Sequence, residues 1–87
     1  MYSYSFRKSL EKELHKRAKK NPEQIRILGK KIQEIVSSKN INHYKNLRKP
    51  LQHLKRVHID KSFVLVFSLH NKHIVFEDFN HHDKIYN

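Results

Sequence analysis

The sequence predicts an α+β fold, in which an N-terminal strand and an antiparallel helical hairpin precede an antiparallel β-meander, with the helices packed on one face of the sheet. Apolar residues alternate at the start of the chain, recur every three or four positions as far as Ile35, and return to a β-type pattern after Leu54. These changes of period indicate a strand, two helices and then a group of strands. With 87 residues, the chain is expected to form one domain, residues 1–87.

The N-terminal residues predict a strand that leads directly into a helix. Tyr2 and Tyr4 alternate with serines, which gives the strand one aromatic face. A stripe with a spacing of four residues follows, formed by Phe6, Leu10, Leu14 and Ala18. This spacing is typical of an amphipathic helix. The basic run 16–20 suits its C-terminus, where the helix dipole places partial negative charge.

A second helix is predicted to begin at Pro22. Asn21 can cap this helix, Pro22 fits its first position, and Gln24 can complete a capping box. One apolar face then follows, formed by Ile25, Leu28, Ile32 and Ile35. Residues 37–40 are polar and end the helix. Because the connection between the two helices is short, we expect them to be antiparallel.

The second half of the chain predicts the β-meander. Residues 63–69 are apolar at both alternating sets of positions, which is typical of a central strand covered on both faces. Residues 74–79 form the next strand, and the polar segments 60–62 and 70–72 predict the turns. The sheet face opposite the helices is expected to be open and to display Lys and His side chains.

The charge of the chain favours a polyanionic partner. Lys and Arg number 19 against 8 Asp and Glu, which gives a net charge of +11, and there are eight histidines. A field of this sign attracts nucleic acid, an anionic surface or an acidic protein. A solvated basic surface without a dedicated partner remains the alternative.

Several classes of protein are excluded or disfavoured. The absence of cysteine excludes disulfides and thiolate metal sites. The longest apolar run, residues 63–67, is too short to cross a bilayer. Residues 1–5 lack the core of a signal peptide. We therefore expect no membrane association and a cytoplasmic location.

Three stretches in this order resemble the RelE/ParE toxin superfamily. They are the leucine-marked segment 44–51, the basic strand, turn and hydrophobic strand 55–67, and the closing His-His-Asp-x-x-Tyr pattern at residues 81–86. The resemblance covers nearly the whole chain. It implies the toxin of a type II toxin–antitoxin system, a ribosome-dependent mRNA endonuclease that an acidic, RelB-like antitoxin neutralises in a hetero-oligomeric complex.

Such a nuclease cuts RNA by attack of the 2′-hydroxyl on the adjacent phosphate. The reaction needs a base, an acid and cations around the phosphate, but no cofactor and no metal. The candidate catalytic residues are His82, His58, Tyr86, Arg56 and Lys55. His82 is the first choice for proton transfer because histidine titrates near neutrality. Tyr86 could stack on an mRNA base, act as a base, or close the core.

Strand periodicity separates the basic residues before the central strand. Arg56 and His58 share one face, whereas Lys55 lies on the other, so Lys55 is the less favoured candidate. Each of them could also be a solvated strand charge, and His82 could be a surface residue of a histidine-rich tail.

Binding and metal ligation call for other residues. Lys45, Arg48, Lys49 and His81 are candidates for contacts with RNA phosphates or antitoxin carboxylates. No metal site is predicted, because adjacent histidines on a strand, His81 and His82, point to opposite faces.

One position departs from the family pattern. Many RNA-cutting members carry an arginine where this chain has Val64, so His58, Lys55 or Arg56 would have to supply that charge. The departure keeps two alternatives open: a ParE-like poison of DNA gyrase that acts by binding, and a non-catalytic RNA-binding module.

Overall fold

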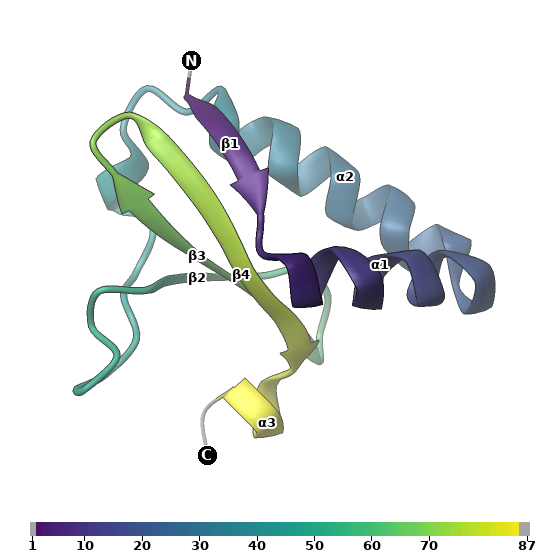
Figure 1. The fold of residues 1–87 in the computed structure, drawn as a ribbon. Helices are drawn as coiled ribbons and strands as arrows, with labels where there is room; N and C mark the ends of the chain where they lie inside the picture. Colours follow the sequence, from purple (N-terminus) through teal and green to yellow (C-terminus); the bar gives the residue numbers. More distant parts are fainter. Residues whose placement is uncertain (1, 86–87) are drawn as a thin grey trace.

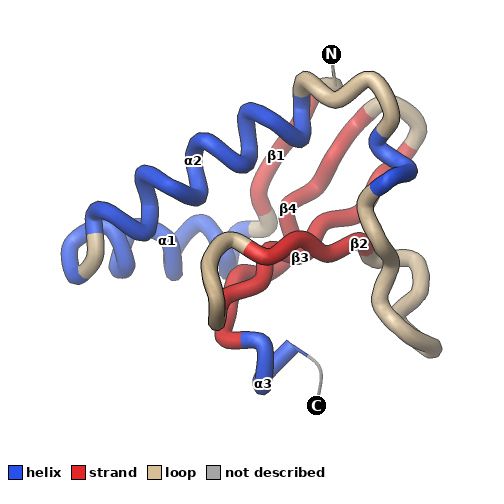
Figure 2. The backbone as a smooth tube through the Cα atoms, turned by 180° about the vertical axis from the view of Figure 1, so that it is seen from behind, coloured by secondary structure: helices blue, strands red, loops and turns tan. Residues whose placement is uncertain are grey.

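The computed structural model describes residues 2–85 and confirms the predicted α+β fold (Figures 1 and 2). In chain order the elements are β1 (Ser3–Phe6), α1 (Lys8–Lys20), α2 (Pro22–Val36), the short 3-10 helix η1 (Ile41–His43), β2 (Lys55–His58), β3 (Phe63–His70), β4 (His73–His81) and α3 (His82–Ile85). Within these residues, no helix combines the length and apolar character that crossing a bilayer requires.

The four strands form one mixed sheet in the order β1-β4-β3-β2. Strands β2, β3 and β4 are the antiparallel meander that the sequence predicts, and β1 joins the other side of β4 in parallel. Asn71 makes the β3–β4 turn with a φ of 57°, a conformation that asparagine tolerates well. A bulge at Glu77 interrupts the pairing, since Val66 pairs with Asp78 and Phe67 with Phe76.

Helices α1 and α2 cover one face of the sheet (Figure 1). The Asn21 side chain caps α2 as expected, accepting a hydrogen bond of 3.1 Å from the backbone N–H of Gln24. The core between them is formed by apolar side chains of both layers. The helices contribute Leu10, Leu28, Ile32 and Ile35, and the sheet contributes Leu65, Phe67, Ile74, Phe76 and Phe79. These side chains fix the helices on the sheet and leave the other face for the loops.

The opposite face of the sheet is not open along its whole length, contrary to the expectation. Val64 and Val66 point to this face and are buried there. Leu47 and Leu54, from the loop before β2, cover them together with Ile85 of α3. The central strand is therefore buried on both sides, which explains why residues 63–69 show no polar alternation.

The basic run at the end of α1 is only partly a solvated helix end. The guanidinium of Arg17 lies 4.9 Å from the ring centroid of Phe63 and 5.5 Å from that of Phe79. These distances are typical of cation–π contacts. Arg17 therefore packs α1 against the sheet, whereas Lys16, Lys19 and Lys20 remain exposed.

Candidate functional site

A pocket of about 680 Å³ lies on the face of the sheet that α1 and α2 leave uncovered. The loop before β2, strand β2 itself and helix α3 line it with the residues Asn46, Leu47, Arg48, Lys49, Pro50, Leu51, Arg56, His58 and Ile85. Four predicted site residues, Arg48, Lys49, Arg56 and His58, thus lie around one cavity. Its apolar wall and basic rim suit a ligand that carries both flat rings and phosphates.

The sheet register places Arg56 and His58 in this pocket. Arg56 lies opposite Val66 on β3, and His58 lies opposite Val64. Directly opposed residues of antiparallel strands point to the same face, so Arg56 and His58 share the pocket face as the sequence predicts. Val64 itself is wholly buried beneath this surface. The cations near it come from the neighbouring strand β2.

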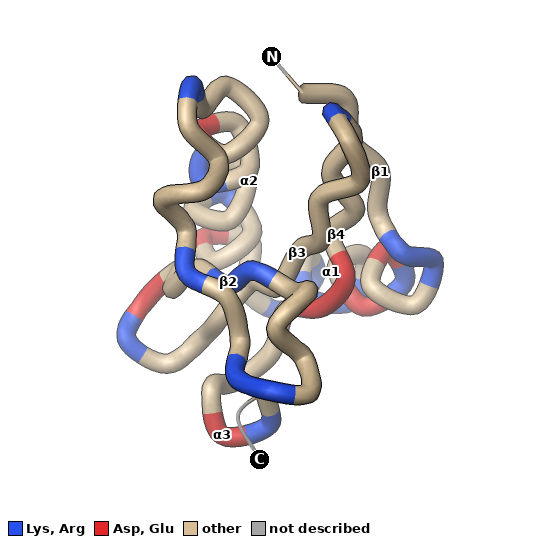
Figure 3. The backbone as a smooth tube through the Cα atoms, turned by 90° about the vertical axis from the view of Figure 1, so that its left-hand side faces the viewer, with Lys and Arg blue, Asp and Glu red and all other residues tan. Residues whose placement is uncertain are grey.

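The loop before β2 is closed on itself and carries two further cations. The Asn46 side chain donates to the carbonyl of Gln52 at 2.7 Å, and the Leu47 N–H donates to the carbonyl of Leu54 at 2.9 Å. Arg48 and Lys49 are exposed between these anchors. Figure 3 shows Lys and Arg on β2 and on this loop, and residues 44–54 contain no Asp or Glu.

Lys55 lies on the other side of the sheet. It is 8% exposed, and its ammonium donates to the carbonyl of Tyr44 at 3.3 Å and to Oδ1 of Asn46 at 3.1 Å. Burial, and then the charge of Glu34, raise the pKa of the neighbouring Tyr44 phenol above its ordinary value. Through its two hydrogen bonds Lys55 ties the loop to β2, and it does not line the pocket.

Of the remaining binding candidates, Lys45 is exposed and its carbonyl accepts a 2.9 Å hydrogen bond from the Arg56 N–H. This bond holds the beginning of the loop beside β2. Tyr86 lies outside the described residues.

The two histidines at the end of β4 lie at the same end of the sheet as His58, but neither of them lines the pocket. His58, Val64 and Asn80 pair in register across β2, β3 and β4, and His81 and His82 directly follow Asn80. Two strand spacings of about 4.8 Å separate β2 from β4. The His82 N–H donates to the carbonyl of Ser62 at 2.8 Å, which fixes the start of α3 to the β2–β3 turn.

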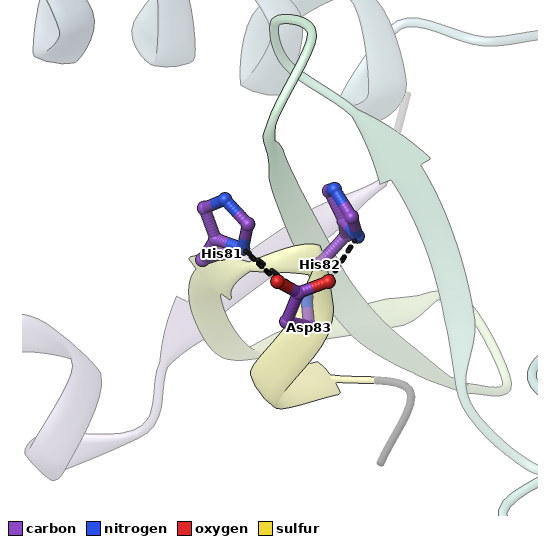
Figure 4. Close-up of side chains that lie close together, drawn as sticks. All are labelled: His81, His82 and Asp83. Atoms are coloured by element: carbon purple, nitrogen blue, oxygen red, sulfur yellow. Dashed lines mark hydrogen bonds and ion pairs between the residues drawn. The ribbon is translucent and has the colours of Figure 1, made fainter.

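The side chains of His81 and His82 lie close together (Figure 4). The prediction that they point to opposite faces of a strand was therefore wrong. Strand β4 ends at His81 and α3 begins at His82, so strand alternation stops between them. Their ring centroids lie 4.5 Å apart with an interplanar angle of 30°. Asp83 lies within ion-pair distance of both rings.

Asp60 is the acidic residue of the adjoining β2–β3 turn. Partial burial acts to raise the pKa of its carboxyl. The other interactions lower this pKa and outweigh burial, so the pKa lies below its ordinary value. They come from the backbone N–H groups of Ser62 and Phe63, the Gln24 side chain and the charge of His81.

A second cavity of about 460 Å³ adjoins the first on the same face. The two share the apolar side chains of Leu47, Leu51 and Ile85. Leu51 is one of the exposed large apolar residues, with 42% of its surface accessible. An apolar strip therefore runs beside the basic pocket.

Two residues that frame the pocket, Asn46 and Ile85, were not predicted from the sequence. They build its wall together with Leu47, and Lys55, predicted as a catalytic candidate, instead holds its loop. The only sequence signal for this role was the leucine spacing of the loop; periodicity could not show that the loop folds back onto the sheet.

The chain is similar over its full length to archaeal proteins. It is 50% identical over 88 residues to a Methanocaldococcus jannaschii protein provisionally named toxin RelE4, covering 99% of this chain and 92% of that protein. It is 49% identical over 88 residues to an uncharacterized Methanosarcina mazei protein, with coverage of 99% and 100%. No protein-family model matches the chain.

Solved structures of toxins share the fold at low sequence identity. YafQ from Escherichia coli BL21(DE3) superposes with a TM-score of 0.79 at 13% identity over 100% of both chains. A copper-bound mutant toxin from Helicobacter pylori superposes with a TM-score of 0.81 at 15% identity, over 98% of this chain and 99% of that one. The E. coli DinJ–YafQ toxin–antitoxin complex superposes with a TM-score of 0.75 at 14% identity, over 99% of this chain and 98% of that one.

The predicted arrangement of elements is thus present in the structure, and a full-length relative at 50% identity carries the RelE name. The chain belongs to the RelE/ParE superfamily of toxins.

Proposed function

We propose that this toxin cuts messenger RNA on the ribosome. The observation that carries the proposal is the gathering of Arg56, His58, Arg48 and Lys49 around one pocket, in a chain that belongs to a toxin superfamily. The pocket offers charge for a phosphate and an imidazole for proton transfer. The ribosome would hold the messenger in the bent form that the reaction requires.

In the proposed reaction the 2′-oxygen attacks the adjacent phosphorus. A 2′,3′-cyclic phosphate forms, the bond from phosphorus to the 5′-oxygen breaks, and the leaving oxygen takes a proton from an acid. Arg56 neutralises the charge that builds on the phosphate, an effect whose removal costs about 10²–10³-fold in rate in comparable sites. Of His58 and His82, one takes the proton of the 2′-hydroxyl and the other gives a proton to the leaving 5′-oxygen, which contributes typically about 10²–10⁴-fold.

The remaining candidates take supporting parts. Arg48 and Lys49 hold phosphates at the rim of the pocket and do not react; Lys45 and His81, which do not line the pocket, would contact the RNA outside it. Tyr86 is assigned to stacking on a messenger base. Lys55 is a positioning residue, because its ammonium is already bonded to Tyr44 and Asn46 on the far side of the sheet.

We further propose that an acidic antitoxin covers this face. Its apolar side chains would fill the strip formed by Leu47, Leu51 and Ile85, and its carboxylates would pair with Arg48, Lys49 and Arg56. A disordered segment that folds into a helix on binding fits such a groove with a charged rim. The DinJ–YafQ complex is a toxin–antitoxin pair on the same fold.

Expression of the toxin in cells, followed by mapping of mRNA 5′-ends, tests the proposal. The wild-type chain should produce cuts in phase with codons and arrest growth. The double variant His58→Ala/His82→Ala should lose both the cuts and the arrest while it still binds the antitoxin, because both side chains lie outside the apolar strip.

Full arrest by the double variant would remove these histidines from the mechanism. DNA damage with intact messages would contradict the nuclease and identify a gyrase poison. Growth without arrest, with RNA bound by the purified wild-type protein, would identify a non-catalytic RNA-binding module.

A further inference from the structure

Two imidazoles and a carboxylate converge where β4 passes into α3 (Figure 4). Nδ1 of His82 lies 3.0 Å from Oδ1 of Asp83, and Nδ1 of His81 lies 3.5 Å from Oδ2 of the same carboxylate. One potential ligand atom from each of the three residues lies within 4.8 Å of the others. We propose that His81, His82 and Asp83 form a binding site for a late first-row divalent metal ion such as Zn²⁺.

The separations fit ligands that share one ion. Bonds of about 2.0–2.2 Å from a zinc ion to nitrogen and oxygen place neighbouring ligand atoms about 3–3.5 Å apart in tetrahedral or octahedral geometry. The distances from the two imidazole nitrogens to Asp83 lie in this range, each to a different oxygen of the carboxylate. The widest separation, at most 4.8 Å, needs to close by about 1 Å, which a rotation of an exposed side chain supplies.

The donor set selects the class of metal. Two imidazole nitrogens with one carboxylate oxygen suit Zn²⁺, Cu²⁺, Ni²⁺ or Co²⁺, whereas Mg²⁺ and Ca²⁺ prefer oxygen ligands alone. Three protein ligands leave the remaining coordination positions to water. The side chains of His81, His82 and Asp83 are 39%, 41% and 70% exposed, so an ion can enter from solvent.

The lone pair of His81 Nδ1 is engaged in a local hydrogen bond beside the carboxylate of Asp83. The backbone N–H of Asp83 donates to Nδ1 of His81 at 3.2 Å, so this nitrogen is an acceptor and carries no proton in that arrangement. The same nitrogen lies 3.5 Å from Oδ2 of Asp83, so a cation could bind both atoms once this hydrogen bond is released. Metal binding would exchange the backbone hydrogen bond for a coordinate bond.

The fold restrains the ring of His81 and the backbone of His82. Phe63 contacts the His81 ring edge to face at 5.8 Å, and the Ser62 carbonyl fixes the backbone of His82. Asp83 supplies the negative charge that favours a cation at this point in a chain with a net charge of +11.

Calorimetric titration of the metal-free full chain with Zn²⁺ tests the site without any activity measurement. The wild-type protein should bind one ion. Asp83→Asn and His82→Ala should each weaken binding at least about tenfold, since even the loss of residues that only orient ligands costs about 10–100-fold in metal affinity. His15→Ala, which removes an exposed histidine of α1, should leave the dissociation constant within a factor of about two.

Co²⁺ gives a second readout. The wild-type protein should develop visible ligand-field bands that the double variant His81→Ala/His82→Ala lacks, with unchanged circular dichroism for both. Absence of one-to-one Zn²⁺ binding by the wild-type chain would overturn the proposal. So would binding by the double variant with wild-type affinity, which would place the ion on other histidines. Neither result bears on mRNA cleavage.

Discussion

The buried ammonium of Lys55 gives the sharpest test of how the pocket is held. Replacement by methionine, in the variant Lys55→Met, nearly keeps the length of the side chain and removes the charge. The change breaks the hydrogen bonds to the Tyr44 carbonyl and to Asn46 Oδ1. Hydrogen bonds from charged groups contribute about 1.5–3 kcal/mol each. Part of this loss is recovered, because the uncharged thioether does not have to be desolvated as an ammonium does.

We expect a net loss of about 2 kcal/mol in the free energy of unfolding, and a fall in Tm of roughly 8–16 °C for a domain of this size. Thermal and urea denaturation followed by circular dichroism measure both quantities. Lys39→Met is the matched control, because Lys39 is exposed and its replacement should change the free energy of unfolding by less than about 0.5 kcal/mol.

The same variant separates a positioning role from a catalytic one. If Lys55 acts by holding the loop in place, Lys55→Met should lower the cleavage rate in proportion to the fraction of molecules in which the loop is disordered. Cooling should restore much of the lost rate. If Lys55→Met were as stable as the wild-type protein but did not cleave RNA, the positioning role would be contradicted and Lys55 would be a catalytic residue.

Three other predictions follow from particular residues. Gly29 is exposed within α2, and an added methyl group there would meet no atom within 4 Å; Gly29→Ala should therefore raise the free energy of unfolding by about 0.5–1 kcal/mol, as urea denaturation would show. The pKa of Asp60 is lowered in the folded state, so its stabilising contribution is present above the unfolded pKa near 3.8 and is lost as pH falls through the lower folded value. Tm measured between about pH 2 and 5 should fall less steeply for Asp60→Asn, and identical curves would exclude this contribution. Zn²⁺ should slow cleavage by the wild-type toxin, because it would occupy His82; a zinc-selective chelator should reverse the effect, and Asp83→Asn should be less sensitive.

The order and type of the elements could be predicted because each carries its own periodicity. The Asn21-Pro22 start of α2 and the two-sided apolar strand 63–69 were both confirmed. The parallel pairing of β1 with β4 could not be predicted, since it depends on contacts between residues about 70 positions apart. Nothing in a local pattern specifies such a partner.

The candidate site was predictable where strand alternation continued and failed where it stopped. Arg56 and His58 lie inside a regular strand, so their shared face followed from the period of two. His81 and His82 straddle the change from β4 to α3, and there the same rule gave the wrong directions. The cover of the sheet by Leu47 and Ile85 arises from tertiary packing, which the sequence pattern did not reveal.

Cleavage of a bound messenger by purified ribosomes and purified toxin, under single-turnover conditions, measures what the pocket on β2 contributes to the reaction. Arg56→Ala is compared with Lys30→Ala, which removes one positive charge from the exposed surface of α2. If Arg56 neutralises the charge on the reacting phosphate, Arg56→Ala should cut about 10²–10³-fold more slowly than the wild-type toxin. Lys30→Ala should cut at a rate close to that of the wild-type toxin. Equal rates for all three proteins would show that the pocket on β2 does not carry the reaction.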